Sequence, residues 1–237
     1  LPVLDAAYPA GERFPRRLVV ELKGRREPDG RVFTVMRLAS AQPNPFPDGP
    51  RATDGGQVIG FQVGAQLGDS LAENPDNADE YRFHDAIHFG FLAVLGWSPA
   101  MRALLRLRRR SDPATLEYED GPRAVFAEEG LAAVLSRLAR RRAGFLTEAA
   151  VTGDVVDVVR ATVADFEVKA MPGWVWRRAI CHGFRALREL DRHGGGYLVA
   201  NLDTRTLSYT TDLAGPLGQP SFASELHHAE SRYSGQE

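Results

Sequence analysis

The feature that most constrains the fold is the stretch YRFHDAIHFGFLAVL, residues 81–95, which is apolar on nearly every side. A helix that is hydrophobic all round is buried, because any exposed side would leave apolar surface in water. We therefore predict a central helix here, covered by other elements of the chain. The same stretch carries His84, Asp85 and His88, and a charged side chain is rarely buried without a partner.

Strands are expected near both ends of the chain. The runs RLVVEL (17–22) and RVFTVMRL (31–38) are rich in β-branched residues, and the Asp29-Gly30 pair between them is typical of a hairpin turn. A second hairpin is predicted over 196–210. Residues 39–56, rich in Pro, Gly and Asp, predict a loop.

Further helices are predicted over 98–110, 122–142, 154–168 and 173–190. Ser98 is the expected N-cap of the first of these and Asp120 of the second, since their side chains accept hydrogen bonds from unpaired backbone N–H groups. The predicted fold class is α+β. It is mainly a helical bundle of about five helices with an all-α core, flanked by short antiparallel strands from the N-terminal and C-terminal regions.

The predicted organisation is one domain over residues 1–212. It has a strand-rich part (1–72), a helical part (80–190) and the hairpin of 196–210. Residues 213–237 show no hydrophobic periodicity, so we expect a weakly ordered tail.

Composition excludes several classes of partner. The formal net charge is −2, so no overall positive field favours nucleic acid. No apolar run approaches the roughly 18–20 residues of a membrane span, so no membrane partner is expected. The single cysteine, Cys181, excludes an internal disulfide and suits a cytoplasmic localisation.

The polar residues of the central helix share one flank. His84 and His88 are one turn apart and about 40° from each other, and Asp85 lies about 100° from His84. On the helix predicted over 122–142, Glu128 falls in the middle of the apolar stripe and Glu129 sits beside it.

Two interpretations of these residues stay open at the level of the sequence. Two histidines facing a carboxylate on a neighbouring helix are how helical bundles build metal sites, which makes His84, His88 and Glu128 candidate ligands. The alternative is a buried hydrogen-bond network that only joins two helices, because an unsatisfied buried polar group costs about 1–3 kcal/mol.

A group of arginines is the second candidate feature: Arg102, Arg106, Arg109 and Arg110. Guanidinium groups suit phosphate oxygens, although a solvated helix end explains the same pattern. Asp120, with Glu117 and Glu119, is expected at the mouth of the same cleft as a further substrate-binding candidate. A metal site together with an anion site is what phosphoanhydride chemistry needs.

The blocks GDSLAENPDNADEYRFHDAIHFGFLAVLGWSPAMRALLRLRRRSDP and EDGPRAVFAEEGLAAVLSRLA resemble the helical C-terminal domain associated with MazG-type nucleoside triphosphate pyrophosphohydrolases. The resemblance covers roughly residues 12–210 and is most specific at 81–112 and 119–135. It implies a cytoplasmic bacterial protein of nucleotide metabolism with a nucleotide substrate and Mg²⁺ or Mn²⁺ as cofactor. The implied partners are a MazG-type catalytic protein or further copies of the same chain.

One departure from the family pattern matters. The all-α pyrophosphohydrolases carry a Glu-x-x-Glu pair on one helix and a Glu-x-x-Asp pair on another. Here the first helix offers histidines, and EYED (117–120) lies before the helix that carries Glu128. The family's carboxylate quartet is therefore not transferable position by position, and mixed His and carboxylate ligands would favour Mn²⁺, Fe²⁺ or Zn²⁺ over Mg²⁺.

The first functional hypothesis is a metal-dependent nucleotide (pyro)phosphohydrolase, in which Asp85 or Glu129 orients or deprotonates the attacking water. One alternative is a non-catalytic nucleotide-binding or oligomerisation module that accompanies a pyrophosphohydrolase. Another is a His/carboxylate iron or zinc enzyme that acts on a substrate other than a nucleotide.

Overall fold

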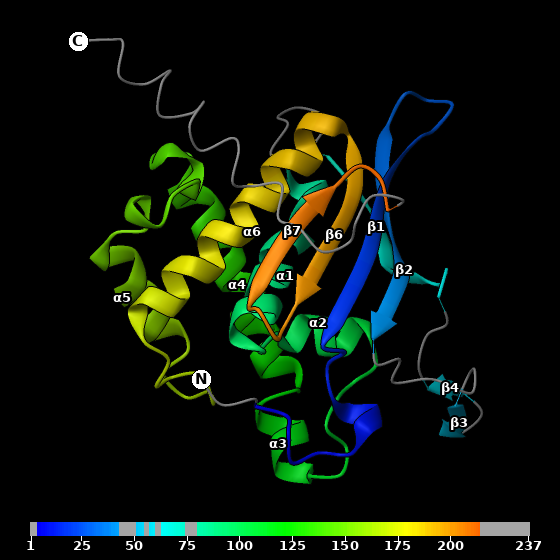
Figure 1. Cartoon of the computed structure of the whole chain (residues 1–237), viewed down its shortest axis with the longest axis vertical. Helices are drawn as coiled ribbons and strands as arrows, with labels where there is room; N and C mark the ends of the chain where they lie inside the picture. The colour runs from blue at the N-terminus through cyan, green and yellow to red at the C-terminus, as the bar shows by residue number, and fades with distance from the viewer. Residues whose placement is uncertain (1–3, 43–50, 55–56, 60–62, 74–79, 214–237) are drawn as a thin grey trace.

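The computed structural model describes residues 4–42, 51–54, 57–59, 63–73 and 80–213 (Figure 1). In this part of the chain a five-stranded antiparallel sheet has the strand order β5-β2-β1-β6-β7. Its strands are β1 (Arg17–Arg26), β2 (Val32–Gln42), β5 (Gln66–Ala72), β6 (Gly195–Asn201) and β7 (Thr206–Thr210). The short strands β3 (Arg51–Asp54) and β4 (Gln57–Ile59) pair with each other. The fold is α+β, as predicted.

The sheet joins the two ends of the chain. β1 and β2 form the predicted hairpin, whose turn places Gly30 at φ 87°, a backbone conformation that glycine adopts without strain. β6 pairs with β1 in a register that sets Ala200 opposite Leu18. The predicted C-terminal hairpin thereby extends the N-terminal one into a single sheet.

Six α-helices occur in the described residues. They are α1 (Asp85–Leu95), α2 (Pro99–Leu104), α3 (Pro113–Tyr118), α4 (Pro122–Ala139), α5 (Gly153–Thr162) and α6 (Gly173–His193). Four short 3₁₀ turns accompany them: η1 (Ala10–Glu12), η2 (Tyr81–Phe83), η3 (Ala143–Phe145) and η4 (Glu148–Ala150). In Figure 1, α1 and α6 lie against one face of the sheet behind β6 and β7, while α4 and α5 lie farther from it.

The central helix predicted from the sequence is α1, and every residue from Asp85 to Leu95 is buried. Two glycines bring it close to α6. A Cβ added at Gly90 would lie 2.5 Å from the carbonyl oxygen of Ala179, and one added at Gly183 would lie 3.0 Å from the Cα of Ile87. This close crossing fixes α1 against the longest helix of the fold, and with it the position of His88.

The core is not all-α. Leu18, Val20 and Leu22 of β1 are buried in the same cluster as Ile87 and the rest of α1. The prediction of an all-α core was wrong because alternate β1 side chains point toward the helices and supply one wall of the core.

Several predicted boundaries shift. The helix of 98–110 ends at Leu104, and Arg106 has φ 54°, so the chain leaves the helix there. The helix of 154–168 ends at Thr162. The predicted loop 39–56 contains the end of β2 and all of β3, while 43–50 and 55–56 lie outside the described residues, as does 214–237 of the predicted tail.

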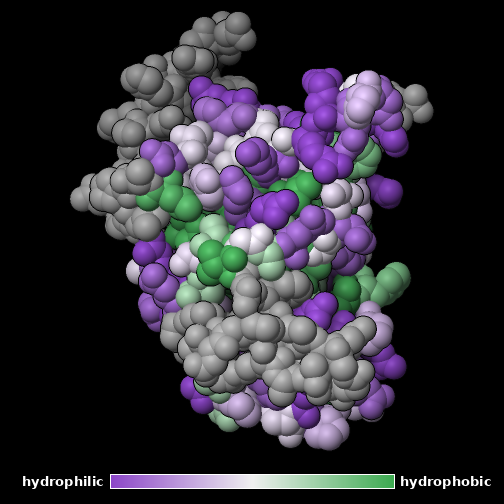
Figure 2. Space-filling model, turned by 90° about the vertical axis from the view of Figure 1, so that its right-hand side faces the viewer, coloured by the Kyte–Doolittle hydropathy of each residue, from purple (hydrophilic) through white to green (hydrophobic). Residues whose placement is uncertain are grey.

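Hydrophilic side chains cover most of the coloured surface on the side of β1 and β2, with smaller hydrophobic areas between them (Figure 2). Among the described helices, none combines the length and the apolar composition that a membrane crossing requires.

Candidate metal centre

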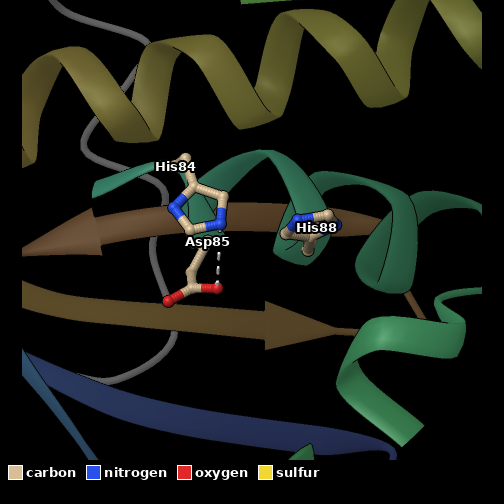
Figure 3. Close-up of side chains that lie close together, drawn as sticks. All are labelled: His84, Asp85 and His88. Carbon is tan, nitrogen blue, oxygen red and sulfur yellow. Dashed lines mark ion pairs between the residues drawn. The ribbon is translucent and has the colours of Figure 1, made fainter. Parts of the chain in front are cut away.

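The side chains of His84, Asp85 and His88 come together at the start of α1 (Figure 3). One potential ligand atom from each of the three lies within 4.8 Å of the others. The Nε2 atom of His84 is 3.9 Å from Oδ1 of Asp85, and the two imidazole rings are 5.5 Å apart and nearly perpendicular. The sequence prediction that these three residues share one flank is consistent with this geometry.

Both histidines are held through Nδ1. Nδ1 of His88 is 2.9 Å from Oε1 of Glu128, and Nδ1 of His84 is 2.8 Å from the carbonyl oxygen of Tyr81. Because each Nδ1 donates its proton to an oxygen, the neutral form of each ring carries its lone pair on Nε2. The Nε2 atom of His88 is buried and makes no hydrogen bond with any described residue. The Nε2 atoms of His84 and His88 are therefore two potential nitrogen ligands that lie near the same carboxylate oxygen, Oε2 of Glu129.

Glu129 is the carboxylate nearest to these two nitrogens. Its Oε2 atom lies 3.4 Å from Nε2 of His88 and 3.7 Å from Nε2 of His84. Its side chain is 45% exposed, whereas His88 is fully buried. Glu129 thus stands between the buried histidine and solvent.

Glu128 lies on the opposite side of His88 from these ligand atoms. Besides contacting Nδ1, its Oε1 accepts a hydrogen bond of 2.6 Å from the Ser98 hydroxyl, and its Oε2 accepts one of 2.7 Å from the Ala100 N–H. Ser98 caps α2 as predicted, with Oγ accepting from the Met101 N–H. Both carboxylate oxygens of Glu128 accept hydrogen bonds from protein donors. Glu128, which the sequence suggested as a metal ligand, therefore contacts the Nδ1 side of His88, away from the Nε2 atom.

The charges of the cluster are strongly coupled. Burial opposes protonation of His88, yet Glu128 and Glu129 raise its pKa well above 6.5. Burial also opposes protonation of His84, while Glu129 and Asp85 raise its pKa. In turn, contacts with His84 and His88 hold the pKa of Glu129 far below 4.5. A metal ion must displace the histidine protons, so its affinity depends on pH.

A cavity of about 540 Å³ opens beside the cluster. His84 and Glu129 line it, together with Tyr81 and with side chains from α4, η3 and α6. Three exposed arginines belong to the same lining: Arg137, Arg140 and Arg188. One residue of the candidate metal centre, His84, therefore lines the same cavity as a group of cations.

The arginines predicted to bind phosphate are placed elsewhere. Arg102 is buried, with Nη2 3.2 Å from Oδ2 of Asp5 and Nη1 donating to the carbonyl oxygens of Glu12 and Leu107. Arg106 and Arg110 are exposed, but neither lines the cavity. The structure does not bring Arg102 to the cavity, because its guanidinium group is bound by other parts of the protein.

Arg109 and Asp120, which the sequence suggested as substrate-binding residues, also lie away from the cavity. Nη2 of Arg109 lies 2.6 Å from Oδ1 of Asp120 and 2.9 Å from Oε1 of Glu167. Asp120 is fully buried and accepts a further hydrogen bond of 2.6 Å from the Arg109 backbone N–H. It does not cap α4, whose N-cap is Gly121 without a side-chain hydrogen bond. This group is a structural ion-pair network, and EYED (117–120) supplies no carboxylate to the cavity.

Arg137, Arg140 and Arg188 are not among the site residues predicted from the sequence. A sequence pattern does point to the two at the end of α4. On the helix face of Glu129, small residues at 132, 133 and 136 are followed by arginines at 137 and 140. Small side chains leave space on that face, and the arginines make its far end basic. No comparable pattern points to Arg188, since its position in the cavity wall depends on how α6 packs against the other elements.

The fold and the cluster together define an α+β domain with a His/Asp group that could hold a metal ion. The model of one protein family, the MazG C-terminal domain, matches residues 49–212. The chain therefore belongs to the MazG C-terminal domain family, which confirms the resemblance found in the sequence. No curated protein and no solved structure matches the chain.

Proposed function

We propose that this domain is a metal-dependent phosphohydrolase that cleaves a phosphoanhydride of a nucleotide. The observation that carries the proposal is the convergence of His84, Asp85 and His88 within 4.8 Å, with His84 itself in the wall of a cavity large enough for a small molecule. Family membership supports the nucleotide as substrate class, since the resemblance is to domains that accompany nucleoside triphosphate pyrophosphohydrolases.

The residues present fit a divalent ion. His88 has a buried Nε2 without a hydrogen bond, and a ligating histidine needs its Nε2 free while its Nδ1 donates to a carboxylate or carbonyl oxygen. His84 meets the same condition through the Tyr81 carbonyl. Two imidazoles and one carboxylate favour Mn²⁺, Fe²⁺ or Zn²⁺ over Mg²⁺.

The remaining residues take supporting roles. Glu128 orients His88 and fixes its tautomer. Glu129, ionised and facing the cavity, orients a water molecule and accepts its proton, which is one of the two roles that the sequence suggested for it. Asp85 takes the ligand role in place of Glu128. A divalent ion bound there would supply Lewis acidity at the phosphoryl group.

The test is a panel of nucleotides with Mn²⁺, Zn²⁺ or Mg²⁺, with phosphate and pyrophosphate measured separately. His88→Asn is the sharpest variant, because the asparagine amide replaces Nδ1 as donor to Glu128 while Nε2 is removed. We expect this variant to stay folded and to lose metal binding and turnover. His193→Ala, on the exposed end of α6, is the matched control and is expected to keep both.

Turnover that survives in EDTA, or in folded His88→Asn, would remove the basis for the proposal. The non-catalytic module considered above gives a different result. In that case a nucleotide raises the melting temperature of the protein, but neither phosphate nor pyrophosphate is released.

A further inference from the structure

The three arginines that line the cavity are not explained by the metal centre. Arg137 lies on α4, Arg140 is the C-cap residue of that helix, and Arg188 lies on α6. Two separate parts of the fold therefore contribute three cations to one cavity. None of the three forms an ion pair with another described residue, in contrast to the fully paired Arg102 and Arg109. Unpaired guanidinium groups that converge on a cavity are suited to bind an anion.

We propose that this cavity is an oligophosphate-binding site, in which Arg137, Arg140 and Arg188 bind a chain of two or three phosphates. Phosphate is favoured over a single carboxylate because three separate guanidinium forks require several oxygens, and a phosphate chain presents them in a row.

The turn that faces Arg188 leaves room for its side chain. Gly144 of η3 has φ 64°, and a Cβ there would lie 2.9 Å from an Nη atom of Arg188. The bare backbone of Gly144 therefore allows the guanidinium to lie against the cavity wall.

The spacing along α4 requires an elongated ligand. Glu129 and Arg140 are eleven residues apart, which is about 16 Å of helix rise and a rotation of only about 20°, so both face the same side. Helical side chains lean toward the N-terminus, which brings the guanidinium groups back toward Glu129. A single phosphate cannot reach from Arg140 to the histidines, whereas a chain of two or three phosphates extends from the guanidinium groups toward them.

The cavity also has apolar lining residues. Ala132, Ala133, Phe184 and Leu187 provide a surface for the uncharged part of such a molecule. The fitting ligand class is therefore a nucleoside di- or triphosphate, or another organic oligophosphate of that length. Placing its reactive phosphate at His84 and His88 rests on the proposed function, whereas anion binding by the arginines does not.

The test is calorimetric titration of the full chain with inorganic tripolyphosphate in EDTA, so that no metal contributes. We expect the double variant Arg137→Ala/Arg140→Ala to bind at least about tenfold more weakly than the wild type, a loss of about 1.4 kcal/mol. Arg141→Ala is the matched control, because Arg141 is exposed beside Arg140 but does not line the cavity, and its affinity is expected to stay unchanged.

A second comparison separates this proposal from the metal centre. Asp85→Asn removes a candidate ligand without removing a positive charge, so it is expected to abolish metal-dependent turnover and to keep tripolyphosphate binding. If Asp85→Asn loses turnover but still binds tripolyphosphate, the result bears on the metal centre and leaves the oligophosphate site supported.

Three results would overturn the oligophosphate site: no binding of tripolyphosphate by the wild type, equal binding by the double variant, or equally tight binding of citrate. Circular dichroism of each variant ensures that a lost affinity is not lost folding.

Discussion

Replacement of Glu128 by glutamine tests how the candidate metal centre is built. The carboxylate serves three buried donors, the Ser98 hydroxyl, the Ala100 N–H and Nδ1 of His88. A glutamine side chain has only one oxygen and adds two N–H donors, so one or two of these donors lose their acceptor. Each unsatisfied buried group costs about 1–3 kcal/mol, and we expect Glu128→Gln to lower the free energy of unfolding by about 2–4 kcal/mol.

The same substitution affects the metal indirectly. An amide N–H facing Nδ1 of His88 forces the imidazole proton onto Nε2, where it blocks the lone pair. Residues that orient a ligand in this way typically contribute about 10–100-fold in metal affinity. We therefore expect a loss of that size, although Glu128 does not lie among the ligand atoms.

Urea unfolding in EDTA measures the first effect, and titration with Zn²⁺ or Mn²⁺ measures the second. Glu117→Gln, on the exposed surface of α3, is the control and should change the unfolding free energy by less than about 0.5 kcal/mol. If Glu128→Gln unfolds at the wild-type urea concentration yet loses the metal, Glu128 is a ligand and its assigned supporting role is wrong.

Three further predictions follow from the contacts described above. Because His88 and His84 have raised pKa values, their contribution to the stability of the metal-free protein is complete below pH 6.5 and is lost as pH rises through their folded pKa values. Saturating Zn²⁺ should remove this loss, because the histidines that bind the metal are already deprotonated. Thermal unfolding from pH 6 to 9 with and without metal checks both expectations, and parallel curves would contradict the metal site. Gly183→Ala should destabilise by about 1–3 kcal/mol because its Cβ meets α1 at 3.0 Å, while Gly130→Ala, with nothing within 4 Å, should be neutral or stabilising; equal melting temperatures would refute the close crossing. Asp120→Asn should lower the free energy of unfolding by about 3–5 kcal/mol, since it removes a carboxylate charge from beside the buried guanidinium of Arg109. It should not change the tripolyphosphate affinity of the folded protein. A weaker affinity without destabilisation would show that Asp120 belongs to the substrate site.

The fold class and the main elements could be predicted because local patterns determine them. The continuous apolar surface of residues 81–95 requires burial, and Asp29-Gly30 between two β-branched runs requires a hairpin. The end of α2 could not be predicted in this way. Arg106 has φ 54°, and it lies between Arg102 and Arg109, whose buried partners include Asp5, 97 residues away from Arg102 in the chain.

The arginines show why charge patterns at helix ends are ambiguous. In the sequence, Arg102 and Arg109 look like an exposed basic patch, and Arg137 and Arg140 look like an ordinary solvated helix end. The structure reverses their environments, because the first two meet acidic partners in the core and the second two line a cavity. Periodicity tells which face of a helix is apolar, but it does not reveal what lies opposite a charge.

The two interpretations of His88 that the sequence left open describe the two sides of one ring. On the Nδ1 side, Glu128 joins α4 to α1 and to the cap of α2, which is the structural network. On the Nε2 side, a buried nitrogen without a hydrogen bond faces His84 and Glu129, which is the candidate metal site. The network does not compete with the site, because holding Nδ1 is what leaves Nε2 available. The carboxylate in the apolar stripe, Glu128, therefore contacts His88, as the sequence suggested. The neighbouring Glu129, one position along α4, is the one that reaches the Nε2 atoms expected to bind the metal.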